Sequence, residues 1–207
     1  MTIFRGGLKS NYMYIIVGLG NPGEEYKSTR HNAGRMAAED FAKKNKFPVW
    51  VFDKKLNAQK SEKKIGGEKT ALILPDTFMN NSGNAVAKII TSQKKAEQLV
   101  VVHDDLDLPL GKFKISFAKS SAGHRGVESV IRKIKTDRFT RLRIGICSGK
   151  KSSPADNKPK VKGLIKFLTE KFTPKEFSVF KKTSKKISLA LEMIIAESPE
   201  KAMNIFN

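Results

Sequence analysis

Short apolar runs alternate with amphipathic stretches along the chain, and this alternation is typical of an α/β protein. Strands are predicted where aromatic and β-branched residues gather, at 14–17, 49–52, 70–74, 99–102, 113–117 and 138–146. Residues 54–69 are polar and contain the turn Gly66-Gly67, so they are predicted to be a connection between two of these strands.

Helices are predicted where apolar residues recur at helical spacing. The first covers about 32–46, the second covers about 81–92 with Ser82 as its N-cap, and a third follows the loop that ends at residue 126. A short helix is predicted within 163–172, and a long one begins at Pro174. The long helix has an apolar face opposite a lysine face, with Phe177, Phe180, Ile187, Leu191 and Ile194 against Lys181, Lys182, Lys185 and Lys186.

With 207 residues and no apparent internal repeat, the chain suits a single domain over residues 14–207. Residues 1–13 are polar and unpatterned, which predicts a disordered lead-in and makes Met13 an alternative start. Residues 149–172 begin with Ser and Pro and are rich in lysine, so we predict a mobile, positively charged flap there. The C-terminal helices are expected at 174–206.

Charge and cysteine content narrow the class of protein. Forty Lys and Arg against twenty Asp and Glu give a formal net charge of +20, which favours a polyanionic partner over a surface that is merely soluble. No run approaches the ~18 apolar residues of a membrane span, and no signal-peptide core is evident, so a cytoplasmic location without membrane contact is expected. Cys147 is the only cysteine and is expected to be a buried, inert thiol.

The first strand ends in a turn rich in Gly, Asn and Pro. Ligands bind at the C-terminal edge of open α/β sheets, so its polar residues are candidates for function, namely Asn21, Tyr26, Arg30, His31 and Asn32. Gly18, Gly20 and Gly23 also spell the G-x-G-x-x-G of a dinucleotide-binding turn. That motif requires a helix at its third glycine, and residues 24–30 lack apolar helical spacing, so the sequence disfavours a dinucleotide site.

Other predicted strands also end in candidate residues. The sequence PDTFMN places Phe78, Met79 and Asn80 where they line either the core or a substrate cleft. The run HDDLD, which contains Asp104, fits a metal site, a solvated acidic turn, or a carboxylate buried beside a histidine, and its spacing does not decide among them. The loop AKSSAGHRG leads into a helix N-terminus, which is a natural anion site to which Arg125 adds charge.

Five blocks in unbroken order together resemble bacterial-type peptidyl-tRNA hydrolases: GLGNPGEEYKSTRHNAG, PDTFMNNSGNAV, VVHDDLDLPLGKFKI, SSAGHRGVESVI and RLRIGI. The resemblance covers about 14–172 and implies a single α/β domain with a mixed central sheet flanked by helices. We also expect a C-terminal helical, lysine-rich lid and a monomer. The resemblance implies hydrolysis of the ester between a peptide and the 3′-terminal ribose of tRNA, which recycles tRNA from premature release. It also implies an enzyme without a metal or cofactor.

The resemblance implies roles for individual residues. His31 matches the catalytic base, Asp104 the carboxylate that orients it, and Asn21 the residue beside the scissile bond. Asn80 matches the asparagine that holds the substrate and the developing oxyanion. The other matched positions are Tyr26, Phe78 and Met79 as a wall against the peptide and terminal nucleotide, and Lys114 and Arg143 as contacts to the tRNA backbone.

Arg125 departs from the pattern, because the family usually has an asparagine at this position. Arginine offers only donors and a permanent charge, so we expect it to bind a phosphate of the acceptor end and to lower the pKa of His31.

An ester is already activated, so one base and one amide donor suffice for its hydrolysis. No G-x-S-x-G elbow, which would supply a nucleophilic serine, is present. The rival hypothesis is a protein of the same fold that binds structured RNA without turnover.

Overall fold

The computed structural model describes residues 13–147 and 161–207, and the interpretations of residues 1–12 and 148–160 lie outside this part. Within it, seven strands form one sheet in the order β2-β3-β4-β1-β5-β7-β6. The inner strands β4 (Glu68–Pro75), β1 (Tyr14–Gly18), β5 (Leu99–Pro109) and β7 (Thr140–Cys147) are parallel. The outer strands β2 (Val51–Asp53), β3 (Ala58–Ile65) and β6 (Phe113–Phe117) pair antiparallel, so the predicted mixed sheet is confirmed.

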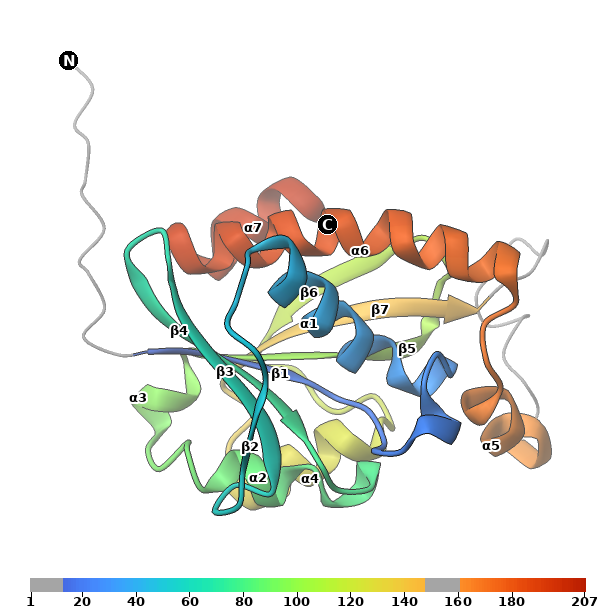
Figure 1. Ribbon diagram of the computed structural model, residues 1–207, viewed down its shortest axis with the longest axis horizontal. Coiled ribbons are helices and arrows are strands. Elements are labelled where there is room, and N and C mark those ends of the chain that lie inside the picture. Colours follow the sequence, from blue (N-terminus) through green and yellow to red (C-terminus); the bar gives the residue numbers. More distant parts are fainter. Residues whose placement is uncertain (1–12, 148–160) are drawn as a thin grey trace.

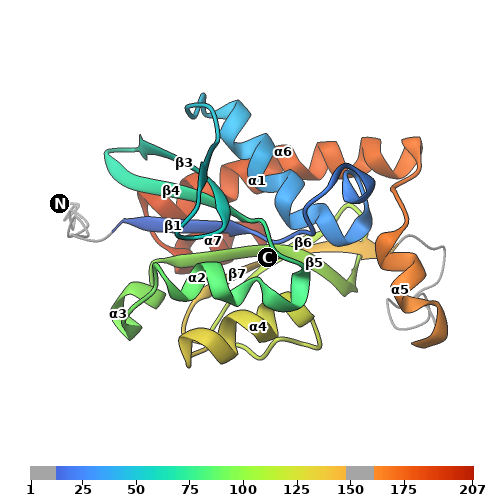
Figure 2. The same cartoon turned by 60° about the horizontal axis from the view of Figure 1, so that its bottom comes forward.

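Helices cover both faces of this sheet (Figures 1 and 2). One face carries α1 (Ala33–Lys44), α6 (Pro174–Ala196) and α7 (Pro199–Phe206). The other face carries α2 (Gly83–Ala87) and α4 (Arg125–Ile134), with α3 (Gln93–Ala96) beside them. Helix α5 (Val161–Thr169) lies at the end of the molecule toward which β7 points. Three short 3₁₀ turns, η1 (Glu24–Tyr26), η2 (Arg30–Asn32) and η3 (Met79–Asn81), follow β1 and β4.

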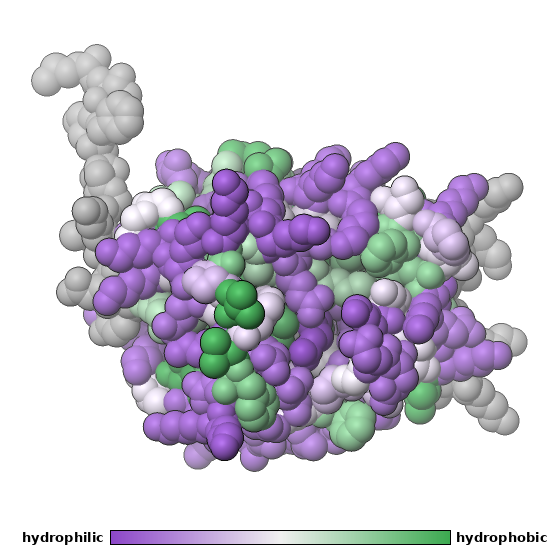
Figure 3. Space-filling view, in the orientation of Figure 1, coloured by the Kyte–Doolittle hydropathy of each residue, from purple (hydrophilic) through white to green (hydrophobic). Residues whose placement is uncertain are grey.

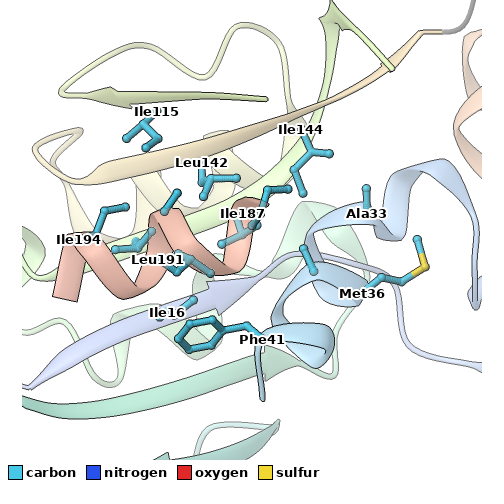
Figure 4. Packing of buried hydrophobic residues seen from close by; sticks show 14 of the residues in the cluster. Ile16, Ala33, Met36, Phe41, Ile115, Leu142, Ile144, Ile187, Leu191 and Ile194 are labelled. Carbon is cyan, nitrogen blue, oxygen red and sulfur yellow. The ribbon is translucent and has the colours of Figure 1, made fainter. Parts of the chain in front are cut away.

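Apolar side chains fill both interfaces between the sheet and its helices. The cluster under α1 and α6 is drawn in Figure 4, which labels Ile16, Ala33, Met36, Phe41, Ile115, Leu142, Ile144, Ile187, Leu191 and Ile194. A second cluster joins Val17, Val101 and Ile73 to Val86 of α2 and Val130 of α4. Strand β1 is buried along its whole length because both of its faces are covered, which explains its continuous apolar sequence.

Two predicted segments differ in the structure. Residues 58–65 form β3, and not a connection, because β3 pairs with β4 along its length, while Glu62, Lys63 and Lys64 are exposed to solvent. That exposure allows the charged residues that obscured the strand in the sequence. The helix predicted at 81–92 is limited to α2, which ends at Ala87, and Ser92 is extended and caps α3 with its hydroxyl. Ser82 precedes α2 without capping it, since its hydroxyl donates to the carbonyl oxygen of Met79.

The predicted C-terminal helices are present. The buried side chains of α6 include Phe180, Ile187 and Leu191, while Lys182, Lys185 and Lys186 are exposed. Helices α6 and α7 therefore belong to the layer that covers the sheet, and α5 is the element beside the strand ends. The surface in Figure 3 is mostly hydrophilic. Among the described residues, no helix is long and apolar enough to cross a membrane.

Helix α1 crosses β5 at Gly34, where a Cβ atom would lie 2.1 Å from the carbonyl oxygen of Val102. Gly34→Ala should therefore lower the free energy of unfolding by about 3 kcal/mol, as expected for overpacking against a rigid backbone. Urea denaturation measures the change. Gly67→Ala is the matched control, because Gly67 has φ +91° and nothing within 4 Å of the added Cβ. Only backbone strain, about 1–2 kcal/mol, applies there. Equal losses in both variants would contradict a steric origin.

Candidate active site

The inner parallel strands end at one edge of the sheet, and the segments that follow them enclose a pocket of about 430 Å³. Its lining comes from the turns after β1 and β4, the end of β5, the start of α4 and helix α5. The residues are Asn21, His31, Phe78, Met79, Asn80, Asp104, Asp105, Leu106, Asp107, Ser121, Ala122, Gly123, His124, Arg125, Leu164, Ile165, Leu168 and Thr169.

Asp104 is the buried centre of this site. It lies in β5 with 2% of its surface exposed, so its carboxylate needs partners to offset the loss of solvation. His31 of η2 places Nδ1 at 3.0 Å from each carboxylate oxygen, and His124 places Nε2 at 2.9 Å from Oδ1. Of the three interpretations of HDDLD, the structure favours a carboxylate buried beside a histidine.

The hydrogen bonds fix which nitrogen of each ring carries the proton. His124 is the N-cap of α4, and its Nδ1 accepts from the backbone N–H of Val127 at 3.2 Å, so Nε2 holds the proton given to Asp104. His31 likewise donates from Nδ1, because a carboxylate only accepts. The neutral His31 ring therefore keeps an unprotonated Nε2, and this residue lines the pocket.

Electrostatics set the basicity of His31. Burial lowers the pKa of the His31 ring, but the charge of Asp104 and the hydrogen bond to it raise the pKa by more, so it lies above its ordinary value. Arg125 opposes this shift and lowers the pKa of His31, in the direction expected from the sequence. Burial alone would raise the pKa of Asp104, yet His31 and His124 hold that pKa well below its usual range.

Hydrogen bonds orient Asn21 so that the NH₂ group of its side-chain amide can donate to a ligand. Its backbone N–H donates to Asn32 Oδ1 at 2.9 Å, and Asn32 Nδ2 donates to the Asn21 carbonyl oxygen at 2.9 Å. The Asn21 Oδ1 atom accepts from the backbone N–H of Met79 at 2.8 Å. These bonds fix the orientation of the side-chain amide, and Nδ2 has no acceptor within the described residues. Asn21 therefore presents a preorganised donor at the pocket.

Asn80, Phe78 and Met79 reach the same pocket from the segment after β4. Arg35 of α1 holds that segment by donating from Nη1 to the Pro75 carbonyl oxygen at 3.1 Å. Phe78 is 57% exposed and Asn80 is exposed, whereas Met79 is buried. Tyr26 does not line the pocket itself; its ring lies edge-on to Phe78 with centroids 6.3 Å apart. Tyr26 therefore supports the predicted wall from behind Phe78.

The basic residues predicted to meet tRNA lie beside the pocket. Lys114 and Arg143 are register partners in the β6–β7 ladder. Arg143 Nε donates to Asp105 Oδ2 at 2.6 Å, and Asp105 lines the pocket, while Lys114 is exposed. Arg125 is exposed at the start of α4 and lines the pocket directly. Arg125 thus lines the pocket, Arg143 reaches its border through Asp105, and Lys114 adjoins Arg143 in the ladder.

The sequence missed two parts of this site. The sequence predicts His124 in a loop, whereas the structure has α4 begin directly after it, so that His124 is the N-cap. Its second contact, to Asp104, joins residues 20 positions apart and has no local signal. The α5 side chains that line the pocket, among them Leu164 and Ile165, had an apolar pattern but no indication of what they would cover.

Comparisons with known proteins match nearly the whole chain. The model of the peptidyl-tRNA hydrolase family matches residues 15–207. The chain belongs to that family. It is 42% identical over 196 residues to a peptidyl-tRNA hydrolase of Aquifex aeolicus, with 93% of this chain and 95% of that protein covered. The peptidyl-tRNA hydrolase of Carboxydothermus hydrogenoformans is 38% identical, with 94% and 98% covered.

The fold agrees as well. A crystal structure of peptidyl-tRNA hydrolase from Acinetobacter baumannii superposes with a TM-score of 0.82 at 28% identity, covering 94% of each chain. In this peptidyl-tRNA hydrolase fold the glycines at the end of β1 and in the turn after it serve packing and turns. Gly18 approaches Gly34 and Ala38 of α1, and Gly23 adopts φ +106°. Helix α1 begins only at Ala33, so the helix that a dinucleotide turn requires at Gly23 is absent from this described segment.

His31, Asp104 and His124 also bring three potential ligand atoms within 4.8 Å of one another. The bonding of His124 disfavours a cation there. Its Nδ1 is occupied by the Val127 N–H, so a metal on Nε2 would leave a ring without a proton on either nitrogen. Metal-bound histidines normally donate from the other nitrogen. A hydrogen-bonded chain therefore accounts for these residues better than a metal centre.

Titration of His31 by NMR tests the electrostatic account in the absence of substrate. Asp104→Asn should lower the pKa of His31, because the carboxylate charge that raises it is removed. Arg125→Asn should raise the pKa of His31 further, because an opposing positive charge is removed. Lys135→Gln serves as a control, being a cation beyond the C-terminus of α4. A His31 pKa that is the same in all of these proteins would contradict the account.

Proposed function

We propose that this chain hydrolyses the ester between a peptide and the 3′-terminal ribose of tRNA, with His31 as general base and Asp104 as the residue that orients it. Membership of the peptidyl-tRNA hydrolase family supports the reaction. The observation that carries the mechanism is the Nδ1 contact of His31 to buried Asp104, which leaves Nε2 unprotonated in a pocket. A raised pKa makes that nitrogen a stronger base.

In the first step, a water molecule attacks the ester carbonyl carbon and His31 Nε2 takes the proton of that water. The imidazolium formed is stabilised by Asp104, which is already ionised and bonded to Nδ1. The carbonyl electrons move to the oxygen, and the resulting oxyanion accepts hydrogen bonds from the amides of Asn21 and Asn80. In the second step the carbon–oxygen ester bond breaks, and His31 returns the proton to the ribose oxygen.

The two asparagines differ in preorganisation. The amide of Asn21 is locked by Met79, so its Nδ2 position is set before substrate arrives. The Asn80 side chain is exposed and has no hydrogen bond within the described residues. We assign Asn21 to the position beside the scissile bond and Asn80 to holding the substrate and the developing oxyanion. Phe78 and Met79 offer apolar surface to the peptide and the terminal nucleotide, with Tyr26 behind Phe78.

The tRNA acceptor end is expected to leave the pocket past Arg125 toward Arg143 and Lys114. Phosphate oxygens suit these cations, and release of counterions makes such binding salt-dependent. We further propose that the protein acts as a monomer in the cytoplasm, where its substrate is made. A non-catalytic RNA-binding role would use the same basic border, but it would give no reason for the His31–Asp104–His124 chain.

His31→Ala should abolish most turnover of an N-blocked aminoacyl-tRNA while leaving tRNA affinity nearly unchanged. A general base acts in the transition state and contributes about 10² to 10⁴ in rate. Asp104→Asn should lose less, because the ring remains while the partner that fixes its tautomer is weakened. Single-turnover hydrolysis and equilibrium tRNA binding are the two measurements.

Wild-type protein treated with EDTA should lose no hydrolytic activity in the same assay. A loss of activity that a divalent ion restores would reinstate the metal interpretation.

Wild type that binds tRNA without releasing it would favour the non-catalytic role. Equal single-turnover rates for wild type and His31→Ala would reject His31 as the base even if the protein is a hydrolase. The two outcomes are distinguishable because the first concerns wild-type activity and the second concerns only the variant.

Substrate binding should depend strongly on salt. If about six phosphates are contacted, affinity should fall roughly 10³-fold between about 50 and 200 mM salt. Lys114→Ala should flatten the slope of log affinity against log salt by about one unit, and Arg143→Ala should do the same. Lys64→Ala on the far strand β3 is the matched control. Slopes that remain unchanged at both tested positions would place the tRNA contact elsewhere.

A further inference from the structure

Helix α5 forms one wall of the pocket through Leu164, Ile165, Leu168 and Thr169. It lies clear of the helices that cover the sheet, at the end of the molecule (Figure 1). Ile165 is 66% exposed, so this part of the helix is not anchored by burial in the core. Phe167 and Leu168, near the C-terminal end of α5, do pack against the core cluster, so the position of the wall relative to His31 depends on how that end is held.

Arg30, the residue before His31, holds that end. Its side chain is 7% exposed, and its guanidinium carbon lies 4.5 Å from the ring centre of Phe167 on α5. Nη1 donates to the carbonyl oxygens of Phe167 and Glu170 at 3.4 and 3.5 Å. Carbonyls at a helix C-terminus lack partners within the helix, so Arg30 satisfies groups that α5 cannot satisfy itself.

The same guanidinium also reaches α6. Nη2 donates to the two carboxylate oxygens of Glu176 at 3.2 and 2.9 Å. Glu176 accepts from the backbone N–H of Thr173 at 2.9 Å and so completes the capping box of α6. Two backbone hydrogen bonds also connect these segments. The Arg30 N–H donates to the Glu170 carbonyl oxygen, and the Phe172 N–H donates to the Ser28 carbonyl oxygen. Arg30 and these backbone bonds thus connect the His31 turn to the end of α5 and to the start of α6.

We propose that Arg30 is a positioning residue that sets α5 against His31 and thereby fixes the width of the pocket that receives the peptide and terminal nucleotide. The proposal deepens the proposed function and rests on it. A purely structural role fits less well, since a buried ion pair contributes little net stability compared with apolar replacements. Arg30 Nε, moreover, is buried without a partner among the described residues.

Contacts with the α5 wall stabilise the bound substrate and the transition state equally. Loss of these contacts should therefore raise KM more than it lowers kcat. The test uses the full chain with N-acetyl-aminoacyl-tRNA. Arg30→Met combined with Glu176→Gln removes both charges, and glutamine at this position preserves the capping box. We expect KM to rise about tenfold, kcat to change less than about threefold, and the acid limb of the pH profile to stay in place. Arg30→Lys should be intermediate, because lysine keeps the charge but loses the planar fork and the stacking.

Thr173→Ala is the matched control, because it breaks the capping box and leaves Arg30 and Glu176 in place. It should leave KM unchanged. Hydrogen exchange should become faster in α5 for the Arg30 variants and not for Thr173→Ala, while the exchange of β5 confirms that all variants are folded. Unchanged KM in the double variant, an equal rise in Thr173→Ala, or a loss confined to kcat would overturn the proposal. Inactive wild type would instead count against the proposed function itself.

Discussion

The buried carboxylate of Asp104 is the group on which the rest of the site depends. An ionised carboxylate away from water is costly unless strong donors surround it, and here two histidines from different parts of the chain donate to it. One of them, His124, also caps α4, and the other, His31, lies in the turn that leads into α1. A single charge therefore joins the end of β5 to the helices on both faces of the sheet.

Close packing makes this convergence possible. Helix α1 reaches β5 only because Gly34 has no side chain, and α4 reaches the site because Gly126 lies against Met79, where a Cβ would be 2.5 Å from the sulfur. The same contacts that build the core also place His31, His124 and Asn21 around one pocket. Stability and reactivity are coupled at these positions, so substitutions there are expected to change both.

Much of the architecture was predictable because the inner strands are buried on both faces and therefore carry uninterrupted apolar sequence. Strand β3 was not, since its pairing with β4 depends on backbone hydrogen bonds and its exposed residues are lysine and glutamate. The position of α1 followed from its apolar helical spacing, and the grouping of His31 with Asp104 followed from the family resemblance of the motif blocks. His124 and Arg30 did not, because their contacts to Asp104 and Glu176 span 20 and 146 residues and leave no periodic signal in the sequence.

The central claim is that Asp104 makes His31 a base of raised pKa whose free nitrogen faces the substrate. The most direct measurement is the pH profile of kcat/KM for an N-blocked aminoacyl-tRNA, compared with the NMR titration of His31 in the same free enzyme. The account predicts one acid limb above the ordinary histidine pKa that coincides with the His31 titration. An acid limb that departs from the titration of His31, or rates that do not fall as His31 becomes protonated, would contradict it.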